Sequence, residues 1–271
     1  MGEWVLRELA VVVNNRNKEI NPKDMIDSIK KAGFKNIFLQ WFNEKELVVS
    51  QEEQLEYARS IGMNIVFVHL GYKRINEIWD TVIEDDIVNE VVDGYINDLK
   101  MCNKYGVDLV IMHLTSKFDA PEYNEKGLER LRRIIKVAEE LGIKIAFENT
   151  KIRGYLEYVF TNINSKNIGL CYDAGHCHAH FDDEFNYDFF KDRILAVHLH
   201  DNFGMHDEHL LPFDGTINWE DVMGKLKGAN YNSYITLEIA HRNDYLKMTM
   251  DEFYKEGYKR GNKLLEFIDK N

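Results

Sequence analysis

A junction that is repeated four times restricts the fold of this chain most strongly. Gly33, Gly62, Gly106 and Gly142 each follow a helical stretch, and each is followed by an apolar residue and then by a short apolar run. Glycine at such a place adopts the left-handed backbone conformation that ends many helices. Because the junction recurs, we predict a chain of alternating helices and strands.

The expected strands are apolar runs without strict alternation, which is typical of parallel strands covered on both faces by helices. The runs extend from 6–13 to 233–239, and they give eight expected strands. Helical patterns lie near 51–62, 85–105, 121–141, 218–228 and 246–268. The 271 residues are close to the length of about 250 residues that is usual for a (β/α)8 barrel. Residues 1–271 are therefore expected to form one α/β domain, either such a TIM barrel or a doubly wound open sheet.

Polar residues at the ends of the apolar runs favour the barrel. An open sheet gathers its chemistry at one switch point, whereas a barrel collects side chains from many strand ends at its C-terminal mouth. Six consecutive runs end in this way, at His69, His113, Glu148, Asp173, His198 and Glu238. Two residues before three of these the chain has small side chains, Ala146, Cys171 and Ala196, which alternation places on the same inner face.

The strand-end residues have the chemistry of metal ligands. A set of carboxylates with imidazole suits Zn2+, Mn2+ or a similar divalent ion, and Glu148, Asp173, His198 and Glu238 form that set. His69 and His113 could ligate a second ion or hydrogen-bond a substrate. Asp207 and His209 are two residues apart in the next loop and could hold one cation together, with His176 nearby.

The composition limits the classes of partner. A net charge of −12 disfavours a broad nucleic-acid groove, although a local basic patch or bound cations would leave nucleic acid open. No apolar run approaches the ~20 residues of a membrane helix, and no signal peptide is recognisable, so we expect a cytoplasmic protein without membrane contact. The three cysteines are irregularly spaced and are expected to be reduced. A homo-oligomer remains open.

From about the third strand to the eighth, these residues resemble the xylose isomerase-like TIM barrel family. This family contains sugar and sugar phosphate isomerases and epimerases together with endonuclease IV. The stretch from His198 to Trp219 is most similar to the sugar phosphate isomerase/epimerase members. In the epimerase branch, the resemblance implies that His176 helps to hold the substrate and that two glutamates exchange protons with it. It also implies one divalent metal bound by Glu148, Asp173, His198 and Glu238.

We accordingly predict a divalent-metal-dependent isomerase or epimerase of a small sugar or sugar phosphate, with proton transfer by Glu148 and Glu238 through an enediolate. His69, His113 and His176 would contact the substrate, and Lys117, with Lys151 and Arg153 on the same rim, would bind a phosphate group. The metal would be Zn2+ or Mn2+, with one tight ion. A second, weaker ion would be held by Asp207, His209 and His176, and a third ion would favour the endonuclease branch.

Two other functions stay open at this point. The endonuclease IV branch, a zinc-dependent hydrolase of abasic-site DNA, has matches to nine positions: His69, His113, Glu148, Asp173, His176, His198, Asp207, His209 and Glu238. That branch begins with a His-x-Ser-like stretch that this chain lacks, and the ketose epimerases carry an arginine where this chain has Gly204. A barrel that binds metal or ligand without turnover is the third alternative.

Overall fold

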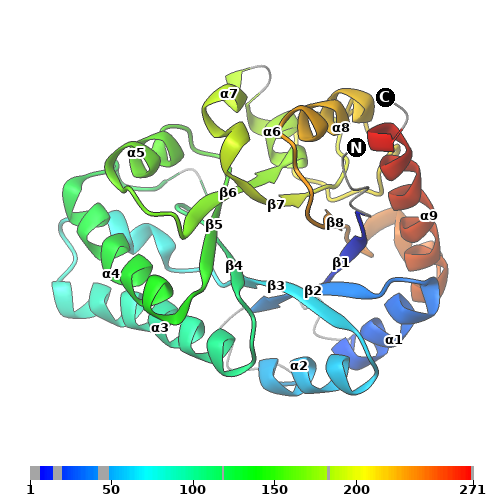
Figure 1. The fold of residues 1–271 in the computed structure, drawn as a ribbon, viewed down its shortest axis with the longest axis horizontal. Coiled ribbons are helices and arrows are strands. Elements are labelled where there is room, and N and C mark those ends of the chain that lie inside the picture. The colour runs from blue at the N-terminus through cyan, green and yellow to red at the C-terminus, as the bar shows by residue number, and fades with distance from the viewer. Residues whose placement is uncertain (1–6, 15–19, 42–48, 118, 182–183, 270–271) are drawn as a thin grey trace, which may run out of the picture.

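Eight parallel strands and the helices around them form the (β/α)8 barrel that the sequence predicts (Figure 1). A computed structural model of the chain describes residues 7–14, 20–41, 49–117, 119–181 and 184–269. Neighbouring strands pair in the order β7-β6-β5-β4-β3-β2-β1-β8. A parallel bridge between Leu199 and Leu237, just beyond β7 and at the end of β8, joins the two outer strands of this order. The barrel is therefore nearly closed.

The strands are β1 (Leu9–Val13), β2 (Asn36–Trp41), β3 (Asn64–Leu70), β4 (Leu109–Met112), β5 (Lys144–Glu148), β6 (Ile168–Asp173), β7 (Ile194–His198) and β8 (Ile235–Leu237). The long helices are α1 (Pro22–Ala32), α2 (Gln51–Ser60), α3 (Asp85–Lys104), α4 (Glu125–Leu141), α8 (Trp219–Gly228) and α9 (Met250–Asp269). Shorter helices that the patterns did not predict are α5 (Tyr155–Asn162), α6 (Ala174–His180), α7 (Tyr187–Phe190), η1 (Ile75–Trp79), η3 (Lys191–Arg193) and η4 (Asn243–Lys247).

The glycines of the repeated junction all have left-handed backbone conformations. Their φ angles are 111° at Gly33, 80° at Gly62, 60° at Gly106 and 70° at Gly142. After α4, the amide of Gly142 donates to the carbonyl of Glu139 at 3.2 Å, and the amide of Ile143 donates to Ala138 at 2.8 Å. These two bonds close the helix and aim the chain into β5. The repeat therefore predicts the helix ends correctly.

Replacing Gly142 with Ala is expected to lower the free energy of unfolding by about 1 kcal/mol, because a Cβ is disfavoured in the left-handed conformation. No atom lies within 4 Å of the added Cβ, so the effect comes from the backbone alone. Gly228→Ala, in α8 and equally uncrowded, is the matched control and should keep or slightly raise stability. Urea unfolding measures both. An equal loss in the two variants would contradict the conformational explanation.

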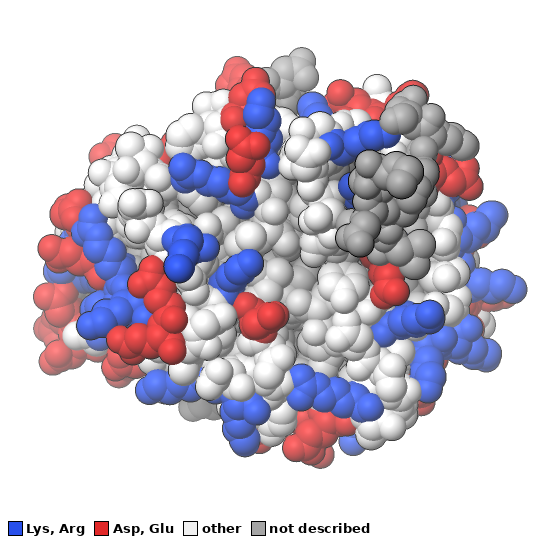
Figure 2. All heavy atoms as spheres, in the orientation of Figure 1, with Lys and Arg blue, Asp and Glu red and all other residues white. Residues whose placement is uncertain are grey.

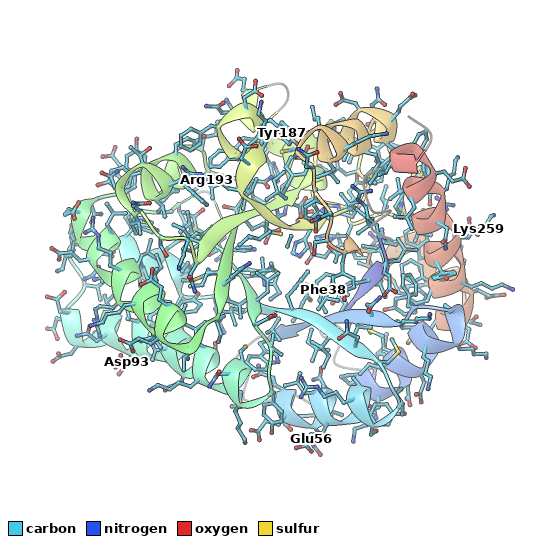
Figure 3. All side chains as sticks on the ribbon, viewed as in Figure 1. Phe38, Glu56, Asp93, Tyr187, Arg193 and Lys259 are labelled. Atoms are coloured by element: carbon cyan, nitrogen blue, oxygen red, sulfur yellow. The ribbon has the colours of Figure 1, made fainter. Side chains whose placement is uncertain are left out.

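The inside of the barrel is filled by a separate apolar cluster beneath the strand-end residues. Its members are Ala10, Val12, Phe38, Val66, Phe67, Ile111, Ala146, Cys171 and Ala196. Phe38 points into the centre of the barrel, whereas Glu56, Asp93 and Lys259 lie on outer helices (Figure 3). The inner-face position expected for Ala146, Cys171 and Ala196 is confirmed. Large rings on one side and small side chains on the other leave room above for the polar residues.

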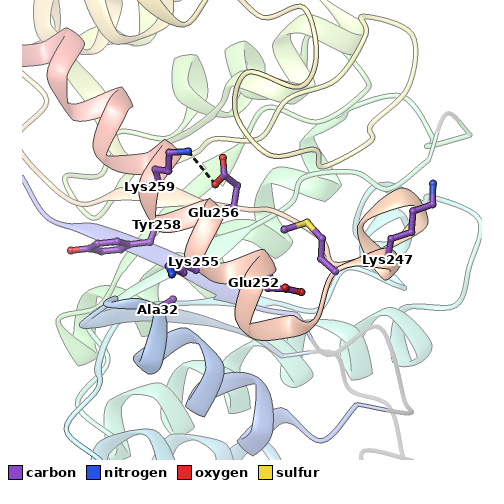
Figure 4. A pocket seen from close by; sticks show the side chains of 8 residues that line it. Ala32, Lys247, Glu252, Lys255, Glu256, Tyr258 and Lys259 are labelled. Atoms are coloured by element: carbon purple, nitrogen blue, oxygen red, sulfur yellow. Dashed lines mark hydrogen bonds and ion pairs between the residues drawn. The ribbon is translucent and has the colours of Figure 1, made fainter.

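The outer surface is mixed in charge. On the face shown in Figure 2, basic and acidic residues are interspersed around the periphery. A shallow hollow on the flank lies among Ala32, Lys247, Met248, Glu252, Lys255, Glu256, Tyr258 and Lys259 (Figure 4). It contains none of the predicted site residues. Among the described helices, none combines the length and the apolar character that a membrane span needs.

Candidate metal centre

Four neighbouring strands bring the predicted ligand set together. Glu148, Asp173 and His198 are the last residues of β5, β6 and β7, and Glu238 follows β8 directly. One ligand atom of each lies within 4.8 Å of the others. All four side chains are buried, with at most 3% of any residue exposed. The register explains this convergence, because Asp173 pairs with His198 and Glu148 pairs with Cys171 on adjacent strands.

His198 lies between the three carboxylates. Its Nδ1 is 3.1 Å from Glu148 Oε1, 3.3 Å from Glu238 Oε2 and 3.8 Å from Asp173 Oδ2. The ring is stacked on Phe38, with ring centroids 5.1 Å apart, so the apolar interior forms the floor of the site. All three carboxylates can therefore share one cation with this imidazole.

His69 and His113 extend the site next to Glu148. Their Nε2 atoms are 3.1 Å and 2.8 Å from Glu148 Oε2, while His198 faces the other carboxylate oxygen. The ring of His113 is also stacked on Tyr72 at 4.2 Å. The sequence left open whether these two histidines bind an ion or a substrate, and their contact with a proposed ligand is compatible with either.

The loop after β7 adds Asp207 and His209 to the site. Asp207 Oδ2 is 3.4 Å from His176 Nε2, and Asp207 Oδ1 is 3.2 Å from His209 Nε2. His209 has a φ of 50°, a left-handed conformation that is uncommon for a residue other than glycine. Such backbone strain is often found at functional sites. The structure thus places Asp207, His209 and His176, the residues of the predicted weaker site, next to one another.

Backbone carbonyls fix the orientation of three of these imidazoles. Nδ1 of His69 donates to Leu70 at 2.9 Å, Nδ1 of His176 donates to Asn149 at 2.9 Å, and Nδ1 of His209 donates to Glu238 at 2.7 Å. A carbonyl can only accept, so Nδ1 carries a proton, and in the neutral ring the lone pair is on Nε2. This arrangement is common in metal-binding histidines.

Carboxylates and imidazoles shift each other's pKa in this buried site. Burial alone would raise the pKa of Glu148, but His198 and His113 outweigh it and hold the pKa well below its usual range. Likewise, burial is outweighed at Glu238, where His198 and His209 lower the pKa to about 2. Burial alone would lower the pKa of His198, yet Cys171, Glu238 and Glu148 raise it well above the usual value. In the metal-free protein, protons thus occupy places where a cation would bind.

The metal-free protein is expected to lose stability as the pH rises above 6.5. The pKa values of His176 and His200 are raised above 6.5 by facing carboxylates, and that of His198 is raised by Cys171, Glu238 and Glu148, in each case against the effect of burial. Their protons stabilise the fold fully below the unfolded pKa, and this contribution is lost as the pH rises through the folded values. His113 and His180, whose pKa values burial lowers, have the opposite sign, but their contribution changes at and below the unfolded pKa and is complete at higher pH. Urea unfolding with a chelator present measures the trend.

Added Zn2+ is expected to remove that alkaline loss, because metal binding replaces the protons and strengthens as they leave. Free energies of unfolding measured with and without Zn2+ at each pH provide the comparison. A chelated protein whose stability is constant or increases above pH 6.5 would contradict the prediction.

Two positioning residues were missed by the sequence analysis. Gln40 ends the apolar part of β2, the same signal that identified His69, and its Nε2 donates to Glu238 Oε1 at 2.8 Å. Asn149 donates to the carbonyl of Asp173 at 2.8 Å and accepts from the amide of the same residue at 2.7 Å. It thereby fixes the end of β5 against the end of β6. No sequence spacing reveals such a bridge.

Lys117 lies apart from these contacts. It is exposed in the loop between β4 and α4, and among the described residues no hydrogen bond or ion pair joins it to the cluster. Arg153 pairs with Glu184 instead of facing the ligands. A role of Lys117 in binding phosphate remains a prediction.

The buried donor set fits a divalent cation. Asp173 Oδ2, Asp207 Oδ1, His113 Nδ1 and both ring nitrogens of His200 have no hydrogen-bond partner among the described residues. A buried polar atom without a partner costs about 1–3 kcal/mol. Carboxylate oxygens and imidazole nitrogens are ligands of Zn2+ and Mn2+. A cation bound among them would satisfy atoms that the protein alone leaves unpaired.

Comparison with known proteins supplies the family context. A family model described as xylose isomerase-like TIM barrel matches residues 26–264. An uncharacterized protein of Methanocaldococcus jannaschii is 26% identical over 253 residues, which cover 89% of this chain and 68% of the relative. A probable endonuclease 4 of Mycoplasma mycoides is 25% identical over 187 residues, which cover 62% of this chain and 63% of the relative. The chain spans less than two thirds of several such relatives.

Solved structures share the fold. A D-tagatose 3-epimerase-like protein has a TM-score of 0.71 at 23% identity, covering 95% of this chain and 99% of that one. D-psicose 3-epimerase from Clostridium cellulolyticum H10 has a TM-score of 0.75 at 16% identity, with coverage of 95% and 99%. At these identities the likeness supports the barrel fold and leaves the reaction to be argued from the site.

Proposed function

We propose, since this chain belongs to the xylose isomerase-like TIM barrel family, that it is a divalent-metal-dependent isomerase or epimerase of a small sugar or sugar phosphate. One observation carries the proposal: Glu148 and Glu238 reach the same imidazole, His198, from β5 and β8. Two buried carboxylates beside a cation site are the groups that proton transfer at a sugar carbon requires. Structures of sugar epimerases with this fold support the choice of substrate class.

The residues divide the chemistry between holding an ion and moving a proton. Glu148, Asp173, His198 and Glu238 would hold the ion. When bound, a divalent ion supplies positive charge that polarises a carbonyl and its neighbouring hydroxyl. Glu148 and Glu238 have lowered pKa values and are ionised at neutral pH, as a base must be. One glutamate removes the carbon-bound proton to give an enediolate. The other carboxylate takes up a proton from solvent and delivers it to the opposite face or the adjacent carbon.

The remaining residues of the mouth would bind and orient the sugar. His176, His69 and His113 are buried next to Glu148 and present ring nitrogens to it. They can equally hydrogen-bond hydroxyl groups of a substrate. Lys117 is the proposed contact for a phosphate group, from its exposed place on the loop after β4.

The test is proton exchange by the metal-loaded protein. Ketoses, aldoses and their phosphates are incubated in D2O with Zn2+ or Mn2+ protein, and NMR follows deuterium incorporation and the appearance of an epimer or isomer. We expect exchange at one carbon that a chelator abolishes. Ligand binding without exchange would contradict catalysis and favour a binding barrel.

Hydrolysis of abasic-site DNA is the second candidate, favoured by one observation. The imidazole and carboxylate groups extend beyond a four-ligand site, on one side to His69 and His113 and on the other to Asp207 and His209. The net charge of −12 opposes binding of a phosphate backbone. An abasic duplex incubated in parallel discriminates: chelator-sensitive nicking without sugar exchange would replace the isomerase proposal.

A further inference from the structure

His200 is a buried imidazole that the proposed function does not use. It lies two residues beyond His198, and the residue is 0% exposed. Neither ring nitrogen has a hydrogen-bond partner among the described residues. Buried polar groups are nearly always hydrogen-bonded, so an unpaired ring at this place requires an explanation.

Packing holds the His200 ring in one place. It is stacked on the ring of His209, with centroids 4.1 Å apart and planes at 21°. On another side it lies against the backbone of Gly175, where a Cβ would be 1.9 Å from Cε1 of His200 and 2.4 Å from each ring nitrogen. Gly175 is in helix α6 and does not have a positive φ, so its lack of a side chain serves this contact and not a turn.

The fixed ring faces two carboxylates from different segments. His200 Nε2 is 3.3 Å from Asp173 Oδ1 at the end of β6 and 3.6 Å from Asp207 Oδ1 in the loop after β7, without the alignment of a hydrogen bond. Asp207 Oδ1 itself has no hydrogen-bond partner among the described residues. One ligand atom each of Asp173, His176 and His200 lies within 4.8 Å of the others. Asp173 Oδ1 also accepts from the amide of His176 at 2.6 Å and keeps a further lone pair, whereas Asp207 Oδ1 and His200 Nε2 are unpaired. Carboxylate oxygens and an imidazole nitrogen this close together are ligands that a divalent cation satisfies.

We propose that His200 is a ligand of a second divalent cation, which it binds through Nε2 together with Asp173 and Asp207. Asp173 serves both ions, because Oδ1 faces His200 while Oδ2 faces His198. The sequence analysis predicted that Asp207, His209 and His176 hold a weaker second ion. The present inference adds His200, which links these three residues to Asp173. It rests on the metal centre of the proposed function and not on its reaction.

The first experiment measures metal content and affinity. Wild-type protein and His200→Asn are loaded with Zn2+, dialysed, and analysed by elemental analysis and by competition with a chromophoric chelator. The wild type should retain at least two ions. His200→Asn should retain the tight ion and weaken the second by about 100-fold or more, since loss of supporting groups alone costs 10- to 100-fold. His178→Asn is the control, because His178 lies one helical turn from Gly175 and its ring contacts Thr216 at 2.8 Å; it should match the wild type.

The outcomes that overturn the proposal are distinct. A wild type with one ion, or unchanged stoichiometry and affinity in His200→Asn, removes the site. Loss of both ions would show that His200 supports the tight site through Asp173 and is not a separate ligand.

Crystals of the zinc-loaded wild type provide a second measurement that needs no variant to fold: anomalous scattering should place an ion about 2.0–2.1 Å from His200 Nε2. A second ion elsewhere would refute the assignment. Neither readout uses turnover, so missing sugar exchange would count against the proposed function alone.

Discussion

Glu238→Gln is expected to slow solvent deuterium incorporation into the sugar substrate by about 10²- to 10⁴-fold, the contribution of a positioned acid or base. The amide has the same shape, and its oxygen can still accept the hydrogen bond that Gln40 donates at 2.8 Å. It cannot take or return a proton at neutral pH. NMR of the metal-loaded variant in D2O measures the exchange rate, and elemental analysis of the same sample shows whether the tight ion is retained.

Glu90→Gln is the matched control for this experiment. Glu90 is on α3 with a side chain 71% exposed, and its Oε2 lies 3.4 Å from Nη1 of Arg74. It should exchange at the wild-type rate. Undiminished exchange in Glu238→Gln with its ion in place would remove Glu238 from the mechanism. Loss of exchange together with loss of the ion would assign Glu238 to metal binding only.

The partner glutamate adds a directional test. If Glu148 and Glu238 act on opposite faces of the sugar, Glu148→Gln should slow proton removal from one epimer and Glu238→Gln should slow it from the other. The two carboxylates reach His198 from strands β5 and β8, which are separated in the barrel order by β6 and β7. Equal effects of both variants on both epimers would contradict a two-base mechanism.

The barrel could be predicted because its strongest signals are local. The left-handed glycine after a helix is a short-range feature, and all four copies end helices as expected. The strand-end ligands are also predicted by a short-range feature, the alternation of side chains along each strand. It places Cys171 with Asp173 and Ala196 with His198 on the inner face. A barrel then brings strand ends together without further information.

The missed parts of the site depend on contacts between distant segments. His200 continues the inner-face alternation of His198, yet its ring position depends on Gly175, 25 residues earlier, and on His209 in a loop. The bridge from Asn149 to the backbone of Asp173 joins two strands and has no motif. Helices α5 to α7 lack the glycine junction that follows α1 to α4, and they were not predicted.

The loop after β7 depends on one buried carboxylate. Asp201 is 0% exposed. Its Oδ1 accepts from the amides of Asn202 at 2.9 Å and Ile217 at 3.1 Å, and its Oδ2 accepts from the amide of Phe213 and the indole of Trp219, both at 2.9 Å. These four bonds tie both ends of the segment that carries Asp207 and His209. Asp201 is therefore the structural anchor of the proposed second cation site without being one of its ligands.

Asp201→Asn is expected to lower the free energy of unfolding by about 3 kcal/mol or more. The amide nitrogen would face two donors that it cannot accept from, and each hydrogen bond to a charged group contributes about 1.5–3 kcal/mol. The carboxylate is packed against the backbone of Gly215, where an added Cβ would lie 2.3 Å from Asp201 Oδ1. The new amide group therefore has little room to turn away on that side. Urea unfolding of the chelated protein measures this change, and Asp221→Asn, an exposed residue paired with Lys225, should change stability by less than about 0.5 kcal/mol.

The same variant separates the two ions. Glu148, Asp173 and His198 are placed by strands β5, β6 and β7, and Glu238 follows β8 and is also held by Gln40, so Asp201→Asn should retain the tight ion although His209 of the loop donates to the backbone of Glu238. Asp207 and His209 would lose their fixed backbone, and affinity for the second ion should fall. Chelator competition on the folded variant measures both affinities. Equal weakening of the two ions would mean that the loop supports the whole centre, and unchanged binding of both would show that Asp207 is placed by His176 and His209 alone.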